Sequence, residues 1–264
     1  MSITDVFAAT RAEGRAALVG YLPAGFPSVQ GSIDAMTAMV EGGCDLIEVG
    51  YPYSDPLMDG PVIQRAAEAS LAAGTRAPDV IDTVAAVAKA GAPTVVMSYW
   101  NPIEAYGVDR FAADLSAAGG SGVITPDLIP DEAASWIAAS QASGLDRIFL
   151  VAPSSTDARL ASTAAATSGF VYAASTMGVT GERASVGGAA AALVARVRSV
   201  TELPICVGLG VSSGKQAAEI AGFADGVIVG SAFVRAMLDA SDVAAGVDAV
   251  RALASELSAG CGRR

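Results

Sequence analysis

Residues 203–229 read LPICVGLGVSSGKQAAEIAGFADGVIV, and this stretch contains the pattern that decides the fold. The apolar run at 203–208 predicts a buried strand, and the glycines and serines after it predict a loop. We expect a helix over 213–221 and a second apolar strand over 224–229. Both runs are nearly continuous rather than alternating, which is typical of parallel strands covered on both faces. The stretch therefore predicts a strand–helix–strand unit.

The same unit recurs along the chain. Six earlier apolar runs predict strands, at 16–21, 44–49, 93–98, 121–125, 146–152 and 169–174. The helices expected between the strands lie at 28–42, 61–73, 78–90, 109–118, 131–143, 156–167 and 187–200, and a final helix lies at 242–258. Eight such units in 264 residues fit a closed (β/α)8 TIM barrel better than the alternative, an open doubly wound sheet.

The expected architecture is a single domain over residues 1–264, because no linker or shift in composition divides the chain. An extra N-terminal helix is predicted at 2–12, and a short helix is predicted after the eighth strand. In such a barrel the chemistry lies at the C-terminal ends of the strands. Two of the loops there are long, at 50–60 and 175–188, and long loops in compact domains are usually functional.

The composition excludes several classes of site. The chain has no histidine, so Ser-His-Asp and Cys-His catalytic sites and histidine-based metal sites are excluded, and we expect no metal. A formal net charge of −11 without a basic patch argues against nucleic acid and anionic membranes as partners. Cys44, Cys206 and Cys261 follow no metal or redox spacing and are expected to be buried. With no targeting leader or membrane-spanning run recognised, we expect a cytoplasmic protein.

Two carboxylates stand out in the second unit. Glu48 shares a face of its strand with Cys44 and Leu46 and lies at the C-terminal end. If that face is the inner one, Glu48 points into the barrel mouth, where burial raises its pKa and favours proton transfer. The alternative is a structural glutamate hydrogen-bonded at the rim. Asp59 ends a loop just before a predicted helix beginning at Pro61, so a helix cap is the alternative to a catalytic role.

The last three loops predict a phosphate site. Gly210, Gly230 and Ser231 follow the seventh and eighth strands, where backbone amides and a short helix N-terminus commonly bind phosphate in these barrels. The sixth loop has the composition of a lid: Gly181 can approach phosphate closely, and Thr180 can reach a carboxylate across the mouth. Tight turns and a disordered surface insertion are the alternatives for these loops.

The stretch IEVGYPYSDPLMDGP (47–61) resembles the signature of the tryptophan synthase alpha subunit family. The likeness continues at 126–128 (PDL), 178–181 (GVTG), 208–213 (GLGVSS) and 229–234 (VGSAFV), and so covers nearly the whole chain. It implies a lyase of tryptophan biosynthesis that cleaves indole-3-glycerol phosphate into indole and D-glyceraldehyde 3-phosphate by a retro-aldol reaction. Lys89 and Lys215, the only lysines, lie on predicted helices, which disfavours a Schiff-base aldolase.

The resemblance also implies roles for individual residues. Glu48 corresponds to the general acid and base, and Asp59 to the carboxylate that engages the indole N1–H. Substrate contacts are implied for Tyr21 and Met97 in the indole pocket, for Tyr172 near Glu48, for Gly181, Gly210, Gly230 and Ser231 at the phosphate, and for Thr180 in the lid. Positions facing a beta subunit are Asp55, Pro56 and Asn101.

The implied assembly is an αββα heterotetramer in which the beta subunit holds pyridoxal phosphate (PLP) and consumes the indole, while this chain needs no cofactor. The loops at 50–60 and 175–188 are then candidate allosteric elements. Three departures from the family, Met58, Met177 and Leu209, affect the packing of the pocket or lid rather than the acid–base pair. Three alternatives stay open: a free-standing lyase that releases indole, another phosphate-binding barrel such as an isomerase, and a non-enzymatic activator of the beta subunit.

Overall fold

The eight strands close into a parallel barrel in which each strand pairs with the next and β8 returns to β1. A computed structural model describes residues 1–174, 187–208 and 210–262. The strands are β1 (Ala17–Pro23), β2 (Leu46–Gly50), β3 (Thr94–Met97), β4 (Gly122–Thr125), β5 (Asp146–Val151), β6 (Val171–Ala174), β7 (Ile205–Gly208) and β8 (Gly226–Val229). The expected TIM barrel is thus confirmed, and the open sheet is wrong.

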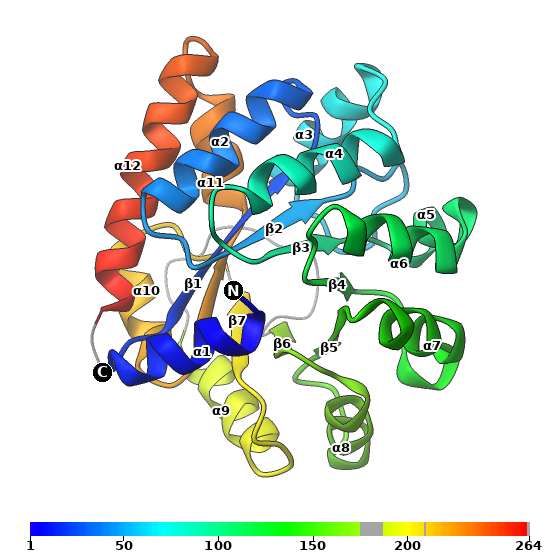
Figure 1. Ribbon diagram of the computed structural model, residues 1–264. Helices are drawn as coiled ribbons and strands as arrows, with labels where there is room; N and C mark the ends of the chain where they lie inside the picture. The colour runs from blue at the N-terminus through cyan, green and yellow to red at the C-terminus, as the bar shows by residue number, and fades with distance from the viewer. Residues whose placement is uncertain (175–186, 209, 263–264) are drawn as a thin grey trace.

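Helices surround this barrel (Figure 1). They are α1 (Ile3–Ala12), α2 (Val29–Glu41), α3 (Pro61–Ala72), α4 (Ala77–Ala88), α5 (Trp100–Tyr106), α6 (Val108–Ala117), α7 (Ala134–Ser143), α8 (Asp157–Ala166), α9 (Gly187–Arg198), α10 (Gly214–Ala221), α11 (Ser231–Leu238) and α12 (Val243–Cys261). The predicted N-terminal helix and the short helix after the eighth strand are therefore present as α1 and α11. No helix in the described ranges has the length and apolar character needed to cross a membrane.

Two apolar cores explain why the strands read as continuous apolar runs. Leu46 belongs to the core inside the barrel, whereas Ile47 and Val49 belong to the core between the strands and the helices. Since side chains alternate along a strand, Glu48 faces inward like Leu46. This places Glu48 on the inner face, as the sequence analysis required for a role at the barrel mouth.

Helix α1 closes the N-terminal end of the barrel. Ser2 caps it by accepting a hydrogen bond from the Asp5 backbone N–H, and Asp5 accepts one from the Ser2 backbone N–H in return. Phe7 is 4% exposed and packs inside the barrel against Phe170, with ring centroids 5.8 Å apart. The closed end leaves the opposite end, where the strands terminate, as the open face.

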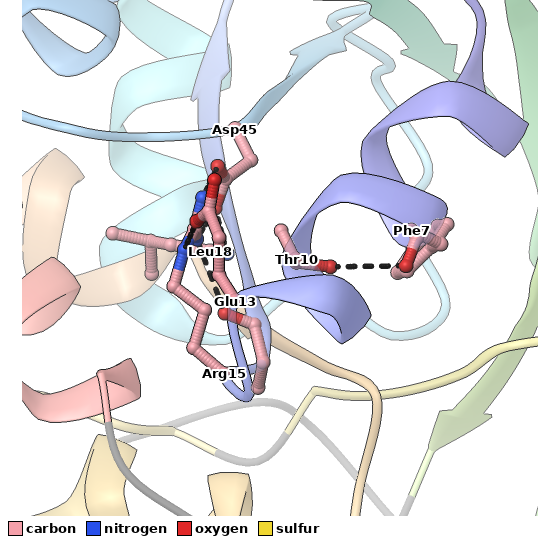
Figure 2. Close-up of polar contacts among 7 residues, drawn as sticks. Phe7, Thr10, Glu13, Arg15, Leu18 and Asp45 are labelled. Carbon is pink, nitrogen blue, oxygen red and sulfur yellow. Dashed lines mark hydrogen bonds and ion pairs between the residues drawn. The ribbon is translucent and has the colours of Figure 1, made fainter.

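A bidentate ion pair fixes the start of β2 at the closed end (Figure 2). Both terminal nitrogens of Arg15 lie 2.7 Å from the carboxylate oxygens of Asp45, which also accepts the Leu18 backbone N–H at 2.8 Å. Paired guanidinium and carboxylate groups of this geometry are among the stronger polar contacts in proteins. Asp45 therefore has a structural role far from the open mouth.

Two local features differ from the expectations. Helix α5 occupies part of a segment expected to be a loop, and Pro130–Glu132 forms a 3-10 turn, so that α7 begins at Ala134 instead of 131. Pro102 is the third residue of α5. Proline is tolerated in the first turn, where its missing N–H would have no intrahelical partner.

Candidate active site

A cavity opens where the strands end. It brings together eight of the predicted site residues: Tyr21, Glu48, Asp59, Met97, Tyr172, Gly210, Gly230 and Ser231. They come from β1, β2, β3 and β6, from the loops after β2, β7 and β8, and from the first residue of α11. The apolar side chains of Ile63, Ile124, Leu150 and Ile228 complete a wall suited to a flat aromatic ring.

Glu48 lies at the bottom of this cavity with little access to water. Its side chain is 2% exposed, and its Oε2 atom has no hydrogen-bond partner among the described residues. Burial, and after it the negative charge of Asp59, raises the pKa of Glu48 to about 8. A carboxyl group with this pKa holds its proton at neutral pH and can act as a general acid. Because no described residue pairs with Oε2, the described part of the chain does not support a purely structural glutamate hydrogen-bonded at the rim.

Asp59 reaches the cavity from the loop after β2. It is 8% exposed, and its Oδ1 accepts a hydrogen bond from the hydroxyl of Tyr99 at 3.2 Å. Helix α3 begins after Gly60 without a side-chain cap, so the interpretation of Asp59 as the cap is wrong. Burial raises the pKa of Asp59, while the Tyr99 hydrogen bond acts in the opposite direction. The two carboxyl groups therefore have different surroundings, since among the described residues only Asp59 accepts a hydrogen bond from a tyrosine. Such a difference allows one carboxyl group of a site to stay protonated while the other is ionised.

Two tyrosines line the cavity because glycines leave room for their rings. A Cβ atom on Gly50 would lie 2.4 Å from the Tyr21 hydroxyl, and one on Gly208 would lie 2.3 Å from the Tyr172 hydroxyl. Tyr21 is aligned with Glu48 in the register of β1 and β2, so the two side chains are neighbours on the inner face. Burial raises the pKa of both tyrosines, which keeps their hydroxyl groups protonated.

The cavity also includes a site suited to an anion. Gly230 precedes α11, whose first residue Ser231 is 6% exposed, and Gly210 has a φ of +64° that favours glycine. Gly230 provides no side-chain cap for α11, so no capping side chain occupies the first amides of this helix among the described residues. Backbone amides and the positive end of a helix dipole can bind phosphate without a cationic side chain.

Some predicted residues fall outside the described ranges or outside the cavity. Thr180 and Gly181, together with Met177 and Leu209, lie among residues 175–186 and 209, which the structure does not describe, so their roles stay predictions. Met58 lines the cavity beside Asp59.

The three positions predicted to face a partner lie at the same end of the barrel but outside the cavity. Asp55 and Pro56 line a separate groove with Tyr53, and Asn101 of α5 donates a hydrogen bond to the Tyr53 hydroxyl at 3.2 Å. Next to them, Leu57 is 73% exposed.

Sequence reasoning missed Tyr99, the residue that contacts Asp59 directly. Tyr99 directly follows the third predicted strand, 93–98, and no role was predicted for it. A buried tyrosine immediately after a barrel strand is the signal that would have identified it. Neither lysine lines the cavity, and the described part of the chain contains no cluster of three or more potential metal ligands.

Comparisons with known proteins point to one family. A model of the family "Tryptophan synthase alpha chain" matches residues 7–261. The chain is 67% identical to the tryptophan synthase alpha chain of Thermobifida fusca over 256 residues, which is 96% of this chain and 95% of the relative. It is 61% identical to the alpha chain of Mycobacterium marinum over 259 residues, covering 98% of this chain and 94% of the relative.

Solved structures give the same result. A structure of Mycobacterium tuberculosis tryptophan synthase superimposes with a TM-score of 0.93 at 59% identity, covering 98% of this chain and 97% of that chain. A tryptophan synthase alpha chain from Legionella pneumophila superimposes with a TM-score of 0.89 at 32% identity, covering 99% of this chain and 97% of that one.

Proposed function

The chain belongs to the tryptophan synthase alpha chain family and is a lyase that cleaves indole-3-glycerol phosphate, and we propose that Glu48 and Asp59 carry out the cleavage. The observation that supports this assignment is their position in one cavity, in different surroundings, beside a pocket of backbone amides. The reaction yields indole and D-glyceraldehyde 3-phosphate.

Glu48 first acts as the acid. It donates its proton to C3 of the indole ring, which converts the indole into an indolenine with positive charge at N1. The negative charge of Asp59 stabilises that charge through a hydrogen bond with N1–H. The pKa of about 8 at Glu48 supports this order, because the group holds the required proton at neutral pH.

Glu48 then acts as the base. As a carboxylate, it removes the proton from the 3′-hydroxyl of the glycerol chain. The electrons of that O–H bond form the aldehyde C=O, and the C–C bond to the ring breaks. Its electron pair returns to the ring and restores neutral indole. Glu48 recovers its proton in this step, so no metal and no Schiff base is required for the atoms and charges to balance.

The phosphate of the substrate binds at the opposite side of the cavity in this proposal. The amides of Gly210, Gly230 and Ser231 and the Ser231 hydroxyl supply its hydrogen bonds. The chain carries a formal net charge of −11, so an anionic ligand gains little from the overall field. Local amides at the start of α11 are therefore the suitable binding group.

The family implies a beta-subunit partner. We propose a cytoplasmic αββα heterotetramer in which the PLP-bearing beta subunit receives the indole, with Asp55, Pro56 and Asn101 of this chain at the interface. Asp55 and Pro56 line one groove, and Asn101 is hydrogen-bonded to Tyr53 of the same groove, so the three positions lie close together on this face.

The proposal is tested by measuring indole release from indole-3-glycerol phosphate by the purified chain, with and without a beta subunit. We expect the Glu48→Gln and Asp59→Asn variants each to lose about 100-fold or more in kcat, as for a lost acid or charge stabiliser. Glu219→Gln, on the exposed side of α10, is the matched control and should keep full activity. Normal turnover by either site variant would disprove its assignment, and normal turnover without any response to a beta subunit would favour a free-standing lyase.

A further inference from the structure

The hydroxyl group of Tyr99 joins three parts of the loop after β2. It lies 3.1 Å from the backbone nitrogen of Leu57, 2.9 Å from that of Met58 and 3.2 Å from Oδ1 of Asp59. A single side chain from the end of β3 thus contacts three consecutive residues of the loop that carries Asp59.

The direction of these hydrogen bonds follows from the number of protons. The backbone N–H groups of Leu57 and Met58 can only donate, so the Tyr99 oxygen accepts both bonds. The hydroxyl has one proton, and its remaining bond is directed to Asp59. Burial raises the pKa of Tyr99 to about 12, so this proton stays in place across the range of an enzyme assay. Asp59 Oδ1 must therefore be the acceptor.

The backbone of Tyr99 is held outside the loop, between β3 and α5. Tyr99 is 2% exposed and directly precedes α5, and its ring packs against Tyr53 with centroids 5.3 Å apart. The next residue, Trp100, donates its backbone N–H to the carboxylate of Asp127 at 2.9 Å, after β4. Asp127 thus fixes the chain next to Tyr99 from outside the loop, whereas Tyr53 belongs to the loop that Tyr99 contacts.

The loop itself has little apolar anchoring at this point. Leu57 is 73% exposed, so it does not bury the loop in a core. Gln64 in α3 also holds the loop, because its side-chain amide donates a hydrogen bond to the Asp59 backbone carbonyl at 2.7 Å. This bond fixes the Asp59 backbone but leaves the rotation of its carboxylate to the bond with Tyr99.

We propose that Tyr99 is a positioning residue for the lyase reaction: its hydroxyl anchors the turn at Leu57 and Met58 and holds the Asp59 carboxylate as an acceptor aimed into the cavity. The inference rests on the proposed role of Asp59 at the indole nitrogen. Tyr99 touches Asp59 rather than the reacting atoms, so it acts through Asp59.

The pH dependence of turnover distinguishes this role from simple packing. Among the described residues, the ionisable groups that face Asp59 are Glu48 from β2, Tyr21 from β1, Tyr172 from β6 and Tyr99. Of these, the Tyr99 hydroxyl donates a hydrogen bond that lowers the pKa of Asp59 against the effect of burial. Without it, Asp59 takes up a proton at higher pH, so the acidic limb of the kcat profile moves to higher pH.

The test is the Tyr99→Phe variant of the full chain. We expect kcat for indole release to fall about 10-fold to 100-fold, the range for a lost hydrogen bond to a charged group, with a much smaller change in KM. The acidic limb should move to higher pH. Calorimetric titration with glycerol 3-phosphate, which carries only the phosphate half of the substrate, should give an unchanged Kd and establish that the variant is folded.

Tyr106→Phe is the matched control. The Tyr106 hydroxyl also donates to a carboxylate, Asp114 Oδ2, at 2.7 Å, but this pair lies on α5 and α6 outside the cavity. The control should leave kcat and its pH profile unchanged. In an Asp59→Asn background, Tyr99→Phe should have little further effect, because the two residues act as one unit.

The possible results distinguish a failure of the proposed function from a failure of the role proposed for Tyr99. An active Asp59→Asn enzyme would refute the proposed function itself. An inactive Asp59→Asn enzyme together with a wild-type pH profile for Tyr99→Phe would refute only the role of Tyr99. A Tyr99→Phe variant that no longer binds glycerol 3-phosphate would show a general structural role and overturn the proposal. The same conclusion would follow if Tyr99→Phe lowered kcat by the same factor in the wild-type and Asp59→Asn chains.

Discussion

Replacing Glu48 by glutamine should stabilise the protein, and the stabilisation should grow with pH. The side chain is 2% exposed, its Oε2 atom has no partner among the described residues, and Asp59 adds a negative charge nearby. Ionised Glu48 is therefore unfavourable in the folded chain. Glutamine keeps the shape of the side chain and cannot ionise.

The magnitude follows from the pKa of Glu48, which rises from 4.5 to about 8 on folding. Because the folded pKa is the higher one, the folded state binds this proton more tightly, and wild-type stability falls as pH rises from about 4.5 to about 8. The full penalty above that window is about 5 kcal/mol, at about 1.4 kcal/mol per pKa unit, and about half of it accumulates between roughly pH 5 and 7. Glutamine removes this part of the pH dependence.

The assay compares the melting temperatures of Glu48→Gln and wild type at about pH 5 and about pH 7. Between these two pH values, the advantage of Glu48→Gln in unfolding free energy should grow by about 2–3 kcal/mol. For a chain of this size, this corresponds to a gain of about 5–10 °C in melting temperature relative to wild type. Glu219→Gln again serves as the control, since it changes an exposed carboxylate and should track the wild type. If Glu48→Gln raised the melting temperature by the same amount at both pH values, Glu48 would not hold its proton in the folded chain and the raised pKa would be wrong.

Two further variants separate the two ends of the barrel. Ser231→Asp places a negative charge in the proposed phosphate site. We expect repulsion to raise KM for indole-3-glycerol phosphate about 10-fold or more, with the melting temperature little changed. An unchanged KM would show that Ser231 does not contact the phosphate. Phe7→Ala removes the ring that closes the bottom of the barrel against Phe170, and urea unfolding should show a loss of about 3–5 kcal/mol with kcat of the remaining folded enzyme unchanged. A stable Phe7→Ala protein would mean that α1 contributes little to the core.

The barrel could be predicted because its strands are buried on both faces. That burial produces continuous apolar runs, and the observed strands lie within two residues of most predicted boundaries. Helix α5 could not be predicted so easily, because Pro102 in its first turn resembles the end of a helix in a sequence. The extent of the single domain, 1–264, stays a prediction.

The candidate site was predictable where a residue's environment depends on local pattern. The inward direction of Glu48 follows from the alternation of side chains along one strand. The environment of Asp59 does not follow from a local pattern. Its partner Tyr99 lies 40 residues further along the chain, and the two residues meet only once the barrel has closed. The environment of Tyr21 also depends on contacts between distant segments, because its ring lies over Gly50 only in the observed register of β1 and β2.

The most direct measurement is a crystal structure of the Glu48→Gln variant with indole-3-glycerol phosphate bound. We expect an Asp59 carboxylate oxygen within hydrogen-bonding distance of the indole N1–H, the amide of residue 48 beside C3 and the 3′-hydroxyl, and the phosphate on the amides of Gly210, Gly230 and Ser231. A substrate whose indole nitrogen points away from Asp59, or whose phosphate lies elsewhere in the barrel mouth, would contradict it.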